Sequence, residues 1–339
     1  MKVFRNKSLK DFNQYGVNTQ AKYLIEIQNE DDINELVKSE YLNEEKILIL
    51  GEGNNILFVN DFNGTIIKPV IKGKEVIKED KENVWIKVYC GENWDNFVKW
   101  CVKNNYQGIE NMVDIPGNIG GVVSQSIGAY GQNIMDAVES VEAVNLKTGE
   151  RKTFTNSECK FSYRSSIFKT TENPEYMIIS STFKLNKGES NPKLNYSSVE
   201  EELKTFAQQP YTISDVMQAV INQRKKKLPS TKEYGTCGCV FENPFVTKEK
   251  YAELSKVIPN LQSYPAGEYI KIPAGRIIDE LGWKGKWKGN TGVYENHALC
   301  VVTNRKASGE EILKLIEEIK KEVKKKYDID LKYEINIIK

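Results

Sequence analysis

The chain has 339 residues, of which 40% are hydrophobic and 28% are charged, and its formal net charge is +1. This composition is typical of a globular protein long enough for two or three domains, and the near-zero charge gives no indication of a nucleic-acid or acidic-membrane partner. No apolar run reaches the roughly 20 residues of a membrane-spanning helix, and the N-terminus lacks the apolar segment of a signal peptide, so we expect a cytoplasmic protein with neither a membrane nor a nucleic-acid partner.

The first 70 residues alternate between strand-like and helical patterns. Residues 23–27 predict a strand, and residues 31–39 predict a helix with one apolar face. Residues 47–50 predict a short buried strand, which a glycine-containing loop at 51–55 follows directly. Residues 65–67 predict the strand that closes this part of the chain.

The middle of the chain mixes strands and helices in no regular βαβ order. In chain order we expect a strand at 84–89, a helix at 94–103, a glycine-rich stretch at 108–131, a hairpin at 140–155 and a strand at 176–185. This mixture favours the α+β class.

A polar stretch at 186–212 indicates a boundary, and a helix at 213–227 follows it. The last helix, at 310–327, begins with a capping box formed by Ser308 and Glu311. Its lysines interleave with glutamates, which favours a solvated face over a nucleic-acid surface. A terminal strand is expected between residues 328 and 338.

Cysteine and histidine usage restricts the possible chemistry. The six cysteines are scattered, and His297 is the only histidine. We therefore expect no disulfide framework and no metal site, although Cys237 and Cys239 form a Cys-x-Cys pair. The sequence contains no Gly-x-Ser-x-Gly nucleophile elbow, and a Ser-His or Cys-His pair would have to use His297. Proton transfer would therefore depend on a cysteine, serine, tyrosine, lysine or carboxylate.

Two glycine-containing segments could hold an anion. Glycine lets the backbone approach a ligand closely, and successive backbone N–H groups suit a diphosphate. The loop at 51–55 is neither a P-loop, because no Gly-Lys-Ser/Thr follows, nor a Rossmann fingerprint, because the third glycine is missing. The alternative is that the longer stretch at 108–131 is an ordinary surface loop.

Three segments in this order resemble the UDP-N-acetylenolpyruvoylglucosamine reductase family. They are residues 51–58, residues 115–133 and the Tyr-Arg-Ser-Ser segment within 159–169. The resemblance continues to Glu334 and covers essentially the whole chain. The segment from Asn195 to Ser198 resembles the tyrosine loop of the family's longer subtype, and residues 261–271 resemble its extra insertion.

The resemblance implies an α+β fold with a two-part FAD-binding domain of the PCMH/vanillyl-alcohol-oxidase type. Its subdomains would span residues 1–69 and 70–212, and a C-terminal α+β substrate-binding domain would span 213–339. It further implies a monomer that uses FAD and NADPH. The residues expected to bind FAD are Gly51, Glu52, Gly53, Asn54, Asn55, Ile115, Pro116, Gly117, Asn118, Gly120, Gly121, Gly128, Ala129, Tyr130 and Gly131.

The implied activity is the reduction of UDP-N-acetylglucosamine enolpyruvate to UDP-N-acetylmuramate in peptidoglycan synthesis. NADPH would reduce the flavin, and the flavin would then deliver hydride to the enolpyruvyl methylene carbon. Negative charge then develops at the neighbouring carbon and is delocalised into the carboxylate. The protein must bind this carboxylate, stabilise the enolate and supply a proton.

Three residues match the family's catalytic positions. Arg164 would bind the carboxylate through its planar guanidinium, and Cys239, at a position where many members carry serine, would donate the proton. Glu334 would face the enolate, a role that requires a protonated or proton-sharing carboxyl. The family motif carries an arginine two positions after the glutamate, but this chain has Asn336 at that position. We therefore expect no contribution from such an arginine here.

Six further residues match the positions that bind substrate. They are Tyr196, Lys227, Asn243, Tyr264, Lys271 and His297. Cations and phenol hydroxyls suit the UDP diphosphate, and His297 is expected to line the active site; a packed core histidine is the alternative. We interpret Cys237 as structural.

Two other functions remain open at this stage. A flavin oxidase of the same superfamily would leave the Arg164, Cys239 and Glu334 set unexplained, and the second flavin segment lacks the histidine to which many such oxidases attach their cofactor covalently. A nucleotide-sugar-binding protein without activity would not require three chemically competent residues at the catalytic positions. Turnover and a flavin spectrum would distinguish these possibilities.

Overall fold

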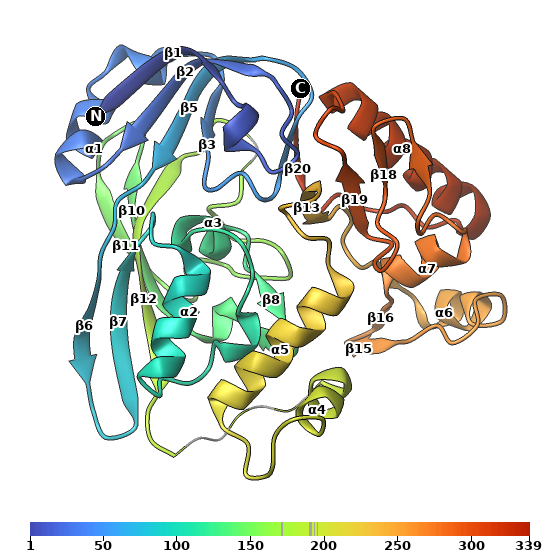
Figure 1. Cartoon of the computed structure of the whole chain (residues 1–339). Helices are drawn as coiled ribbons and strands as arrows, with labels where there is room; N and C mark the ends of the chain where they lie inside the picture. The colour runs from blue at the N-terminus through green and yellow to red at the C-terminus, as the bar shows by residue number, and fades with distance from the viewer. Residues whose placement is uncertain (171, 190–191, 193, 195) are drawn as a thin grey trace. The chain divides into compact units, whose positions relative to one another are not determined.

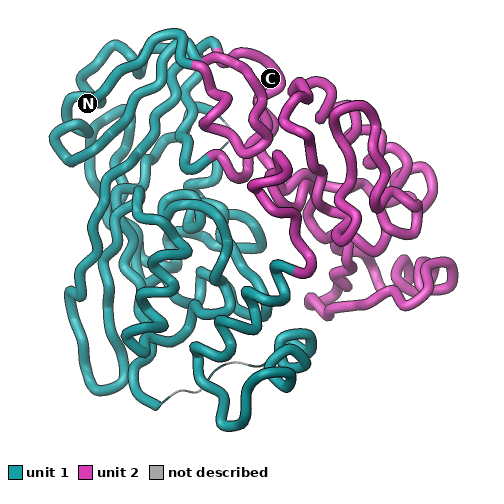
Figure 2. The backbone as a smooth tube through the Cα atoms, viewed as in Figure 1, with its two compact units in different colours: residues 1–7, 21–52, 63–225 teal, residues 8–20, 53–62, 226–339 magenta. Residues whose placement is uncertain are grey.

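The computed structural model describes residues 1–339 except residues 171, 190, 191, 193 and 195, and Figure 1 shows its elements. The chain forms two compact units, which Figure 2 distinguishes by colour. Unit 1 comprises Met1–Lys7, Ala21–Glu52 and Asn63–Lys225; unit 2 comprises Ser8–Gln20, Gly53–Phe62 and Lys226–Lys339.

These units do not follow the three consecutive segments expected from the sequence. Residues 8–20 and 53–62 belong to unit 2, and residues 213–225 belong to unit 1. The division of unit 1 into two FAD-binding subdomains near residue 70 stays a prediction, which its two separate sheets support.

The first sheet of unit 1 has the order β1-β2-β5-β3. Its strands are β1 (Lys2–Ser8), β2 (Gln20–Ile27), β5 (Phe62–Pro69) and β3 (Ile47–Ile49). Helix α1 (Glu30–Val37) begins where Asn29 accepts a hydrogen bond from the Asp32 N–H at 2.9 Å. The parallel pairing of β3 with β5 places the loop that starts at Gly51 immediately after the sheet.

The second sheet of unit 1 is antiparallel and has the order β11-β10-β12-β7-β6. Its strands are β6 (Lys74–Glu79), β7 (Asn83–Tyr89), β10 (Val138–Asn145), β11 (Arg151–Thr155) and β12 (Tyr176–Asn186). Strand β6 was not predicted, because all six of its side chains are exposed and its sequence shows no apolar alternation. It is an edge strand, which explains this exposure.

The glycine-rich stretch of unit 1 contains short elements rather than an open loop. After helix α2 (Trp94–Lys103) come the 3₁₀ helix η3 (Glu110–Met112), helix α3 (Ile119–Ser124), the hairpin β8 (Gly128–Ala129) and β9 (Gln132–Asn133), and the 3₁₀ helix η4 (Ile134–Asp136). The ring of Trp94 packs against Phe97 and Phe183, with centroids 6.0 Å away in both cases. This aromatic cluster fixes α2 against the sheet.

The polar stretch at 186–212 is not a simple linker. It contains helix α4 (Ser197–Leu203), whose buried Glu202 accepts hydrogen bonds from Asn222 at 3.1 Å and Gln223 at 2.8 Å in helix α5 (Ile213–Lys227). The buried residues Val216 and Val220 of α5 join the core of unit 1. This packing explains why α5 as far as Lys225 belongs to unit 1.

Unit 2 contains three small sheets, three α-helices and the 3₁₀ helix η1 (Lys10–Phe12). Strands β13 (Gly235–Cys239), β19 (Cys300–Thr303), β18 (Thr291–Val293) and β17 (Trp287–Lys288) form one sheet. Strands β14 (Phe245–Val246), β16 (Tyr269–Lys271) and β15 (Tyr264–Ala266) form a second, and β4 (Ile56–Phe58) pairs with β20 (Asn336–Ile338) in the third. The helices are α6 (Lys248–Leu254), α7 (Ala274–Glu280) and α8 (Gly309–Tyr327).

Helix α8 confirms the helix predicted near the C-terminus. Ser308 accepts a hydrogen bond from the Glu311 N–H at 3.1 Å, and the apolar stripe that includes Ile312, Ile316 and Ile319 is buried. The terminal strand is shorter than expected and is limited to β20. Across the described residues, no helix combines the length and apolar character needed to cross a bilayer.

Candidate active site

The loop at residues 51–55 is shaped by a backbone contact that only glycine permits. Gly53 has φ +70°, and a Cβ built on it would lie 2.1 Å from the carbonyl oxygen of Phe12. Its own carbonyl accepts a hydrogen bond from the Gln14 N–H at 3.0 Å. Among the hydrogen bonds of the described residues, none uses a backbone N–H of residues 51–55 as donor, so this loop retains donors for an anion.

The two glycine segments predicted to bind flavin meet within unit 1. A Cβ on Gly51 would lie 2.9 Å from Oδ1 of Asn118. The same Oδ1 accepts a hydrogen bond from the Gly121 N–H at 3.0 Å and caps helix α3. Gly117, with φ +141°, precedes this cap. The short helix α3 is thus held directly beside the end of the first loop.

The hairpin that follows α3 contains Tyr130, a non-glycine residue with φ +46°. The Tyr130 carbonyl accepts a hydrogen bond from the buried Asn111 side chain at 2.8 Å, which holds this turn in place. Between α3 and the hairpin, the buried Oε1 of Gln125 has no hydrogen-bond partner among the described residues. A buried amide oxygen without a partner is unfavourable unless a ligand or water satisfies it, so this atom fits a site that holds a polar cofactor.

Arg164 lies beside the same hairpin. Ser162 and Ser165 exchange backbone hydrogen bonds at 3.0 and 3.1 Å, which forms a tight turn in which Arg164 has φ +55°. The guanidinium donates to the Gly128 carbonyl at 3.2 Å and lies 5.2 Å from the centre of the Tyr163 ring. The predicted carboxylate-binding arginine and the second flavin segment are therefore neighbours in unit 1.

The predicted tyrosine loop contacts this hairpin too. The ring of Tyr196 meets the ring of Tyr130 edge-on, with centroids 5.3 Å apart. Tyr196 is 37% exposed and immediately precedes helix α4. Asn195, the first residue of the predicted tyrosine loop, lies outside the described residues.

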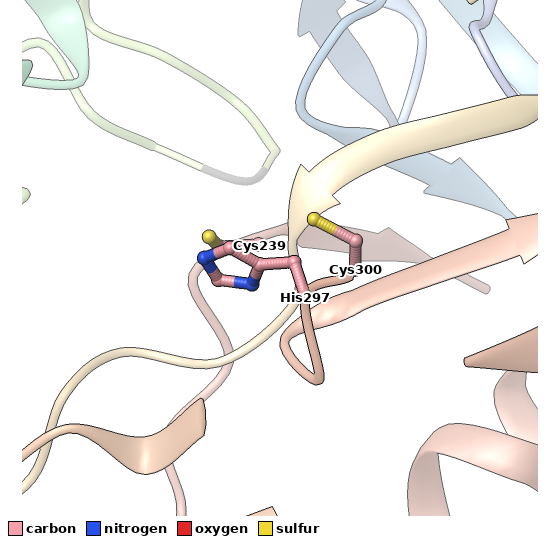
Figure 3. A group of neighbouring side chains, drawn as sticks. All are labelled: Cys239, His297 and Cys300. Atoms are coloured by element: carbon pink, nitrogen blue, oxygen red, sulfur yellow. The ribbon is translucent and has the colours of Figure 1, made fainter. Parts of the chain in front are cut away.

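Three side chains that carry a sulfur or an imidazole nitrogen gather in unit 2. Cys239, His297 and Cys300 each offer an atom, and these atoms all lie within 4.8 Å of one another (Figure 3). Cys239 ends β13 and is partly exposed, whereas Cys300 begins β19 and is buried. The absence of a bound metal ion stays a prediction.

One hydrogen bond fixes the orientation of His297 and the tautomer of its neutral ring. Its Nδ1 accepts a hydrogen bond from the Leu299 N–H at 3.3 Å, so a neutral ring carries its proton on Nε2. Burial lowers the pKa of His297, and the positive charges of Lys227 and Lys284 lower it further. The imidazole is therefore neutral at physiological pH.

Glu334 lies on the chain segment that pairs with the end of β13. Its N–H donates to the Val240 carbonyl at 2.9 Å, directly beside Cys239. The Glu334 carbonyl accepts from the Asn55 side chain at 3.0 Å, and the Asn336 N–H donates to the Asn55 carbonyl at 3.0 Å. Within unit 2, Glu334 is therefore bonded both to the residue that follows Cys239 and to Asn55 of the first glycine loop.

The residues expected to bind substrate differ in their surroundings. Tyr264 and Lys271 are paired across β15 and β16, with Nζ 5.7 Å from the ring centre. Lys227 is exposed and is close enough to His297 to influence its pKa. Asn243 uses its Oδ1 to accept the Ala274 N–H at 3.0 Å at the start of α7, so its side chain has a structural bond as well.

Three residues near these sites were not singled out from the sequence. Lys68 donates to the Gly51 carbonyl at 2.7 Å, and its pKa is lowered by burial. The sequence did offer a signal for Lys68, because a single lysine follows the apolar pair Ile66 and Ile67 of a predicted strand. Gln125 and Cys300 carried no such signal, because their proximity to the sites arises from tertiary packing.

Comparisons with known proteins agree along the whole chain. A family model described as "UDP-N-acetylenolpyruvoylglucosamine reductase, C-terminal domain" matches residues 229–338, and one described as "FAD binding domain" matches residues 21–155. Proteins named UDP-N-acetylenolpyruvoylglucosamine reductase from Flavobacterium johnsoniae and Amoebophilus asiaticus are 40% and 35% identical, and each match covers 100% of both chains.

A solved structure shows the same fold. The UDP-N-acetylenolpyruvylglucosamine reductase of Thermus caldophilus aligns with a TM-score of 0.70 and 23% identity over 100% of both chains. The predicted α+β fold, with an FAD-binding domain followed by this family's C-terminal domain, is confirmed. The chain is an FAD-dependent oxidoreductase that belongs to the UDP-N-acetylenolpyruvoylglucosamine reductase family of peptidoglycan synthesis.

Proposed function

We propose that the chain reduces UDP-N-acetylglucosamine enolpyruvate to UDP-N-acetylmuramate, with NADPH as the source of electrons. The observation that supports this most is the hydrogen bond from the Glu334 N–H to the carbonyl of Val240, the residue that follows Cys239. Bound FAD would accept hydride from NADPH and pass it to the methylene carbon of the enolpyruvyl group. The two substrates would use the site in turn, which is a ping-pong arrangement.

The residues expected to hold FAD have suitable donors. The N–H groups of residues 51–55 are available to a diphosphate. The N–H groups of Ile119, Gly120 and Gly121 at the start of α3 already donate within the protein, so α3 supports the first loop at Gly51 and those three groups are not donors to the cofactor. Lys68 fixes the loop through the Gly51 carbonyl. Gln125 offers its buried Oε1 to a hydrogen-bond donor of the cofactor.

Arg164 would bind the carboxylate of the enolpyruvyl group. A guanidinium forms two parallel hydrogen bonds with a carboxylate and stays charged, so it stabilises the negative charge that moves into this group during reduction. The contacts of Arg164 with Gly128 and Tyr163 hold its side chain near the second flavin segment.

Cys239 would donate the proton that completes the reaction. Its Sγ–H gives a proton to the carbon beside the carboxylate, and the electron pair of the S–H bond stays on sulfur as thiolate. An ordinary thiol is mostly protonated at neutral pH and is a stronger acid than a serine hydroxyl. His297, which carries its proton on Nε2 when neutral, belongs to the same group of side chains, and its N–H would stabilise the thiolate once the two side chains approach to hydrogen-bond distance.

Glu334 would contact the enolate from the side opposite Arg164. A carboxylate facing an enolate is repulsive, so this role requires Glu334 either to be protonated or to share a proton with the enolate. The backbone bonds of Glu334 to Val240 and Asn55 fix its position in unit 2.

The remaining predicted residues would hold the UDP portion. Lys227, Lys271 and the phenols of Tyr196 and Tyr264 provide charges and donors for a diphosphate. The Nδ2 amino group of Asn243 can donate to the substrate while its Oδ1 accepts the Ala274 N–H. His297 would contact the substrate near Cys239.

Anaerobic half-reactions test the proposed roles separately. NADPH should bleach the flavin absorption, and UDP-N-acetylglucosamine enolpyruvate should restore it. Replacing Cys239 with alanine should leave bleaching near normal and abolish restoration, whereas serine should retain substantial activity because its hydroxyl can donate a proton. Restoration at the normal rate in Cys239→Ala would exclude Cys239 as the proton donor, and no bleaching of the original protein by NADPH would exclude the proposed reductant.

A further inference from the structure

Cys239 and Cys300 occupy directly opposed positions on neighbouring antiparallel strands. The register pairs Cys239 of β13 with Cys300 of β19. The next pair along, Val240 and Leu299, is joined by a hydrogen bond of 3.0 Å, so the two cysteines form a non-hydrogen-bonded pair. The Cα atoms of such pairs lie about 4.5 Å apart, which falls within the range of about 4.4–6.8 Å that a disulfide spans.

The two sulfur atoms are also close to each other and differ in access. Both belong to the group of atoms that lie within 4.8 Å of one another, and Figure 3 shows the two side chains with His297. Cys239 is partly exposed, so a small dissolved oxidant can reach it; Cys300 is buried, so it meets only its neighbours. This is the arrangement of an attacked thiol and a resolving thiol.

A zinc ion is the competing occupant of this group, and His297 disfavours it. A histidine that binds zinc usually donates its second ring N–H to an acceptor. Here Nδ1 instead receives the Leu299 N–H, which favours the tautomer with a proton on Nε2. Zinc binding through Nε2 would require the loss of this hydrogen bond, whereas a bond between the two sulfurs requires no change at His297.

We propose that Cys239 and Cys300 form a reversible disulfide when the protein meets a hydroperoxide. The Cys239 thiol ionises, its thiolate attacks one oxygen of hydrogen peroxide and the O–O bond breaks; the sulfur becomes a sulfenic acid, and the leaving hydroxide takes up the proton that the thiol released, which gives water. The Cys300 thiol then attacks the Cys239 sulfur, an S–S bond forms, and a second water leaves. The two thiols lose two electrons and two protons in total, and one hydrogen peroxide is reduced to two water molecules.

This modification would control the proposed activity. The disulfide removes the Sγ–H that Cys239 would donate, so turnover stops until a thiol reductant restores it. The control of turnover rests on the proposed function, whereas disulfide formation does not. The two can therefore be tested separately on the same sample.

The first experiment measures the covalent change. The holoprotein is treated with hydrogen peroxide and alkylated, and its peptides are examined by mass spectrometry. We expect a peptide that links Cys239 to Cys300 and that dithiothreitol separates. Peroxide treatment that yields only unlinked peptides, or sulfinic acid on Cys239 as the first product, would overturn the proposal.

Variants of Cys300 test the role of the second thiol. Cys300→Ser and Cys300→Ala are both made, because a buried hydroxyl and a small cavity perturb folding differently. In either variant we expect normal basal turnover and a sulfenic acid on Cys239 that reacts with dimedone and progresses to irreversible loss of activity. Cys237→Ser is the matched control, because Cys237 lies on the same strand, is buried, and bonds the Ile56 carbonyl at 3.1 Å, a bond that serine can retain; it should oxidise like the original protein.

The remaining outcomes are decided by activity and metal content. A reversible disulfide with unchanged restoration of the flavin by substrate would support the modification and refute Cys239 as proton donor. One equivalent of zinc retained after dialysis, lost in Cys300→Ser and protective against peroxide, would mean that the group is a metal site and would overturn the disulfide proposal. Peroxide inactivation that dithiothreitol reverses equally well in Cys300→Ser and in the original protein would overturn it as well.

Discussion

Replacement of Gly53 by alanine tests how the first glycine loop is built. The residue has φ +70°, and an added Cβ would meet the Phe12 carbonyl oxygen at 2.1 Å and the Asn13 Cα at 2.9 Å. Because Gly53 and residues 8–20 both belong to unit 2, the clash falls within one compact unit. The contact is with backbone atoms, so no side chain can rotate away to relieve it.

Two terms give the expected size of the effect. The left-handed conformation costs an alanine about 1–2 kcal/mol. Even the shortest tolerable Cβ contact, 3.0 Å, requires the loop and the Phe12 segment to separate by about 0.9 Å. Forced displacement of packed atoms costs a further ~1–3 kcal/mol, so we expect a total loss of about 2–5 kcal/mol and a marked loss of FAD affinity.

Gly267→Ala is the matched control. Gly267 has φ +64° but nothing lies within 4 Å of its Cβ position, so alanine there should cost only the conformational term of about 1–2 kcal/mol and leave FAD binding unchanged. The measurements are denaturant unfolding and titration of the apoprotein with FAD. Equal losses of stability in the two variants, or normal FAD affinity in Gly53→Ala, would refute the steric reasoning.

Three other variants test single residues. Arg164→Lys should lower the rate of flavin reoxidation by substrate roughly 10–100-fold, because the paired hydrogen bonds to a carboxylate are lost; near-normal stopped-flow rates would contradict this role. Lys68→Met should weaken FAD binding roughly 10-fold by freeing the Gly51 carbonyl, and an unchanged dissociation constant would exclude that role. The pKa of His297 is lowered in the folded protein, so its contribution to stability is present above the unfolded pKa of about 6.5 and is lost as pH falls toward the lower, folded pKa. His297→Gln should therefore flatten the decline of unfolding free energy between neutral pH and about pH 5, and an identical decline would show that another group is responsible.

Local patterns in the sequence were sufficient for several elements. The apolar periodicity that includes Ile312 and Ile316 predicted α8, and Ser308 with Glu311 marked its start, because a helix face and a capping box depend on residues close in sequence. The short apolar run at 47–50 predicted β3. The exposed strand β6 was missed because an edge strand has no apolar face to reveal it.

The sequence also determined the chemical types available to the site. Glycines in two segments, one arginine in a Tyr-Arg-Ser-Ser context and a cysteine in a serine-like position were sufficient to indicate the family, which the comparisons confirmed. The roles of Arg164, Cys239 and Glu334 are predictions carried by that resemblance. Residue types can be interpreted in this way because each side chain has only a few possible chemical roles.

Only the tertiary structure decided which distant residues meet. The contact of Gly53 with the Phe12 carbonyl, the approach of Gly51 to Asn118 and the pairing of Cys239 with Cys300 join segments that lie tens of residues apart or more. Register and loop packing depend on how whole faces fit together, and a shift of one residue in β19 would replace Cys300 opposite Cys239 by a side chain of the other face. One sequence contains no local signal for such a choice, since the free energy that selects it arises from the packing of the folded unit.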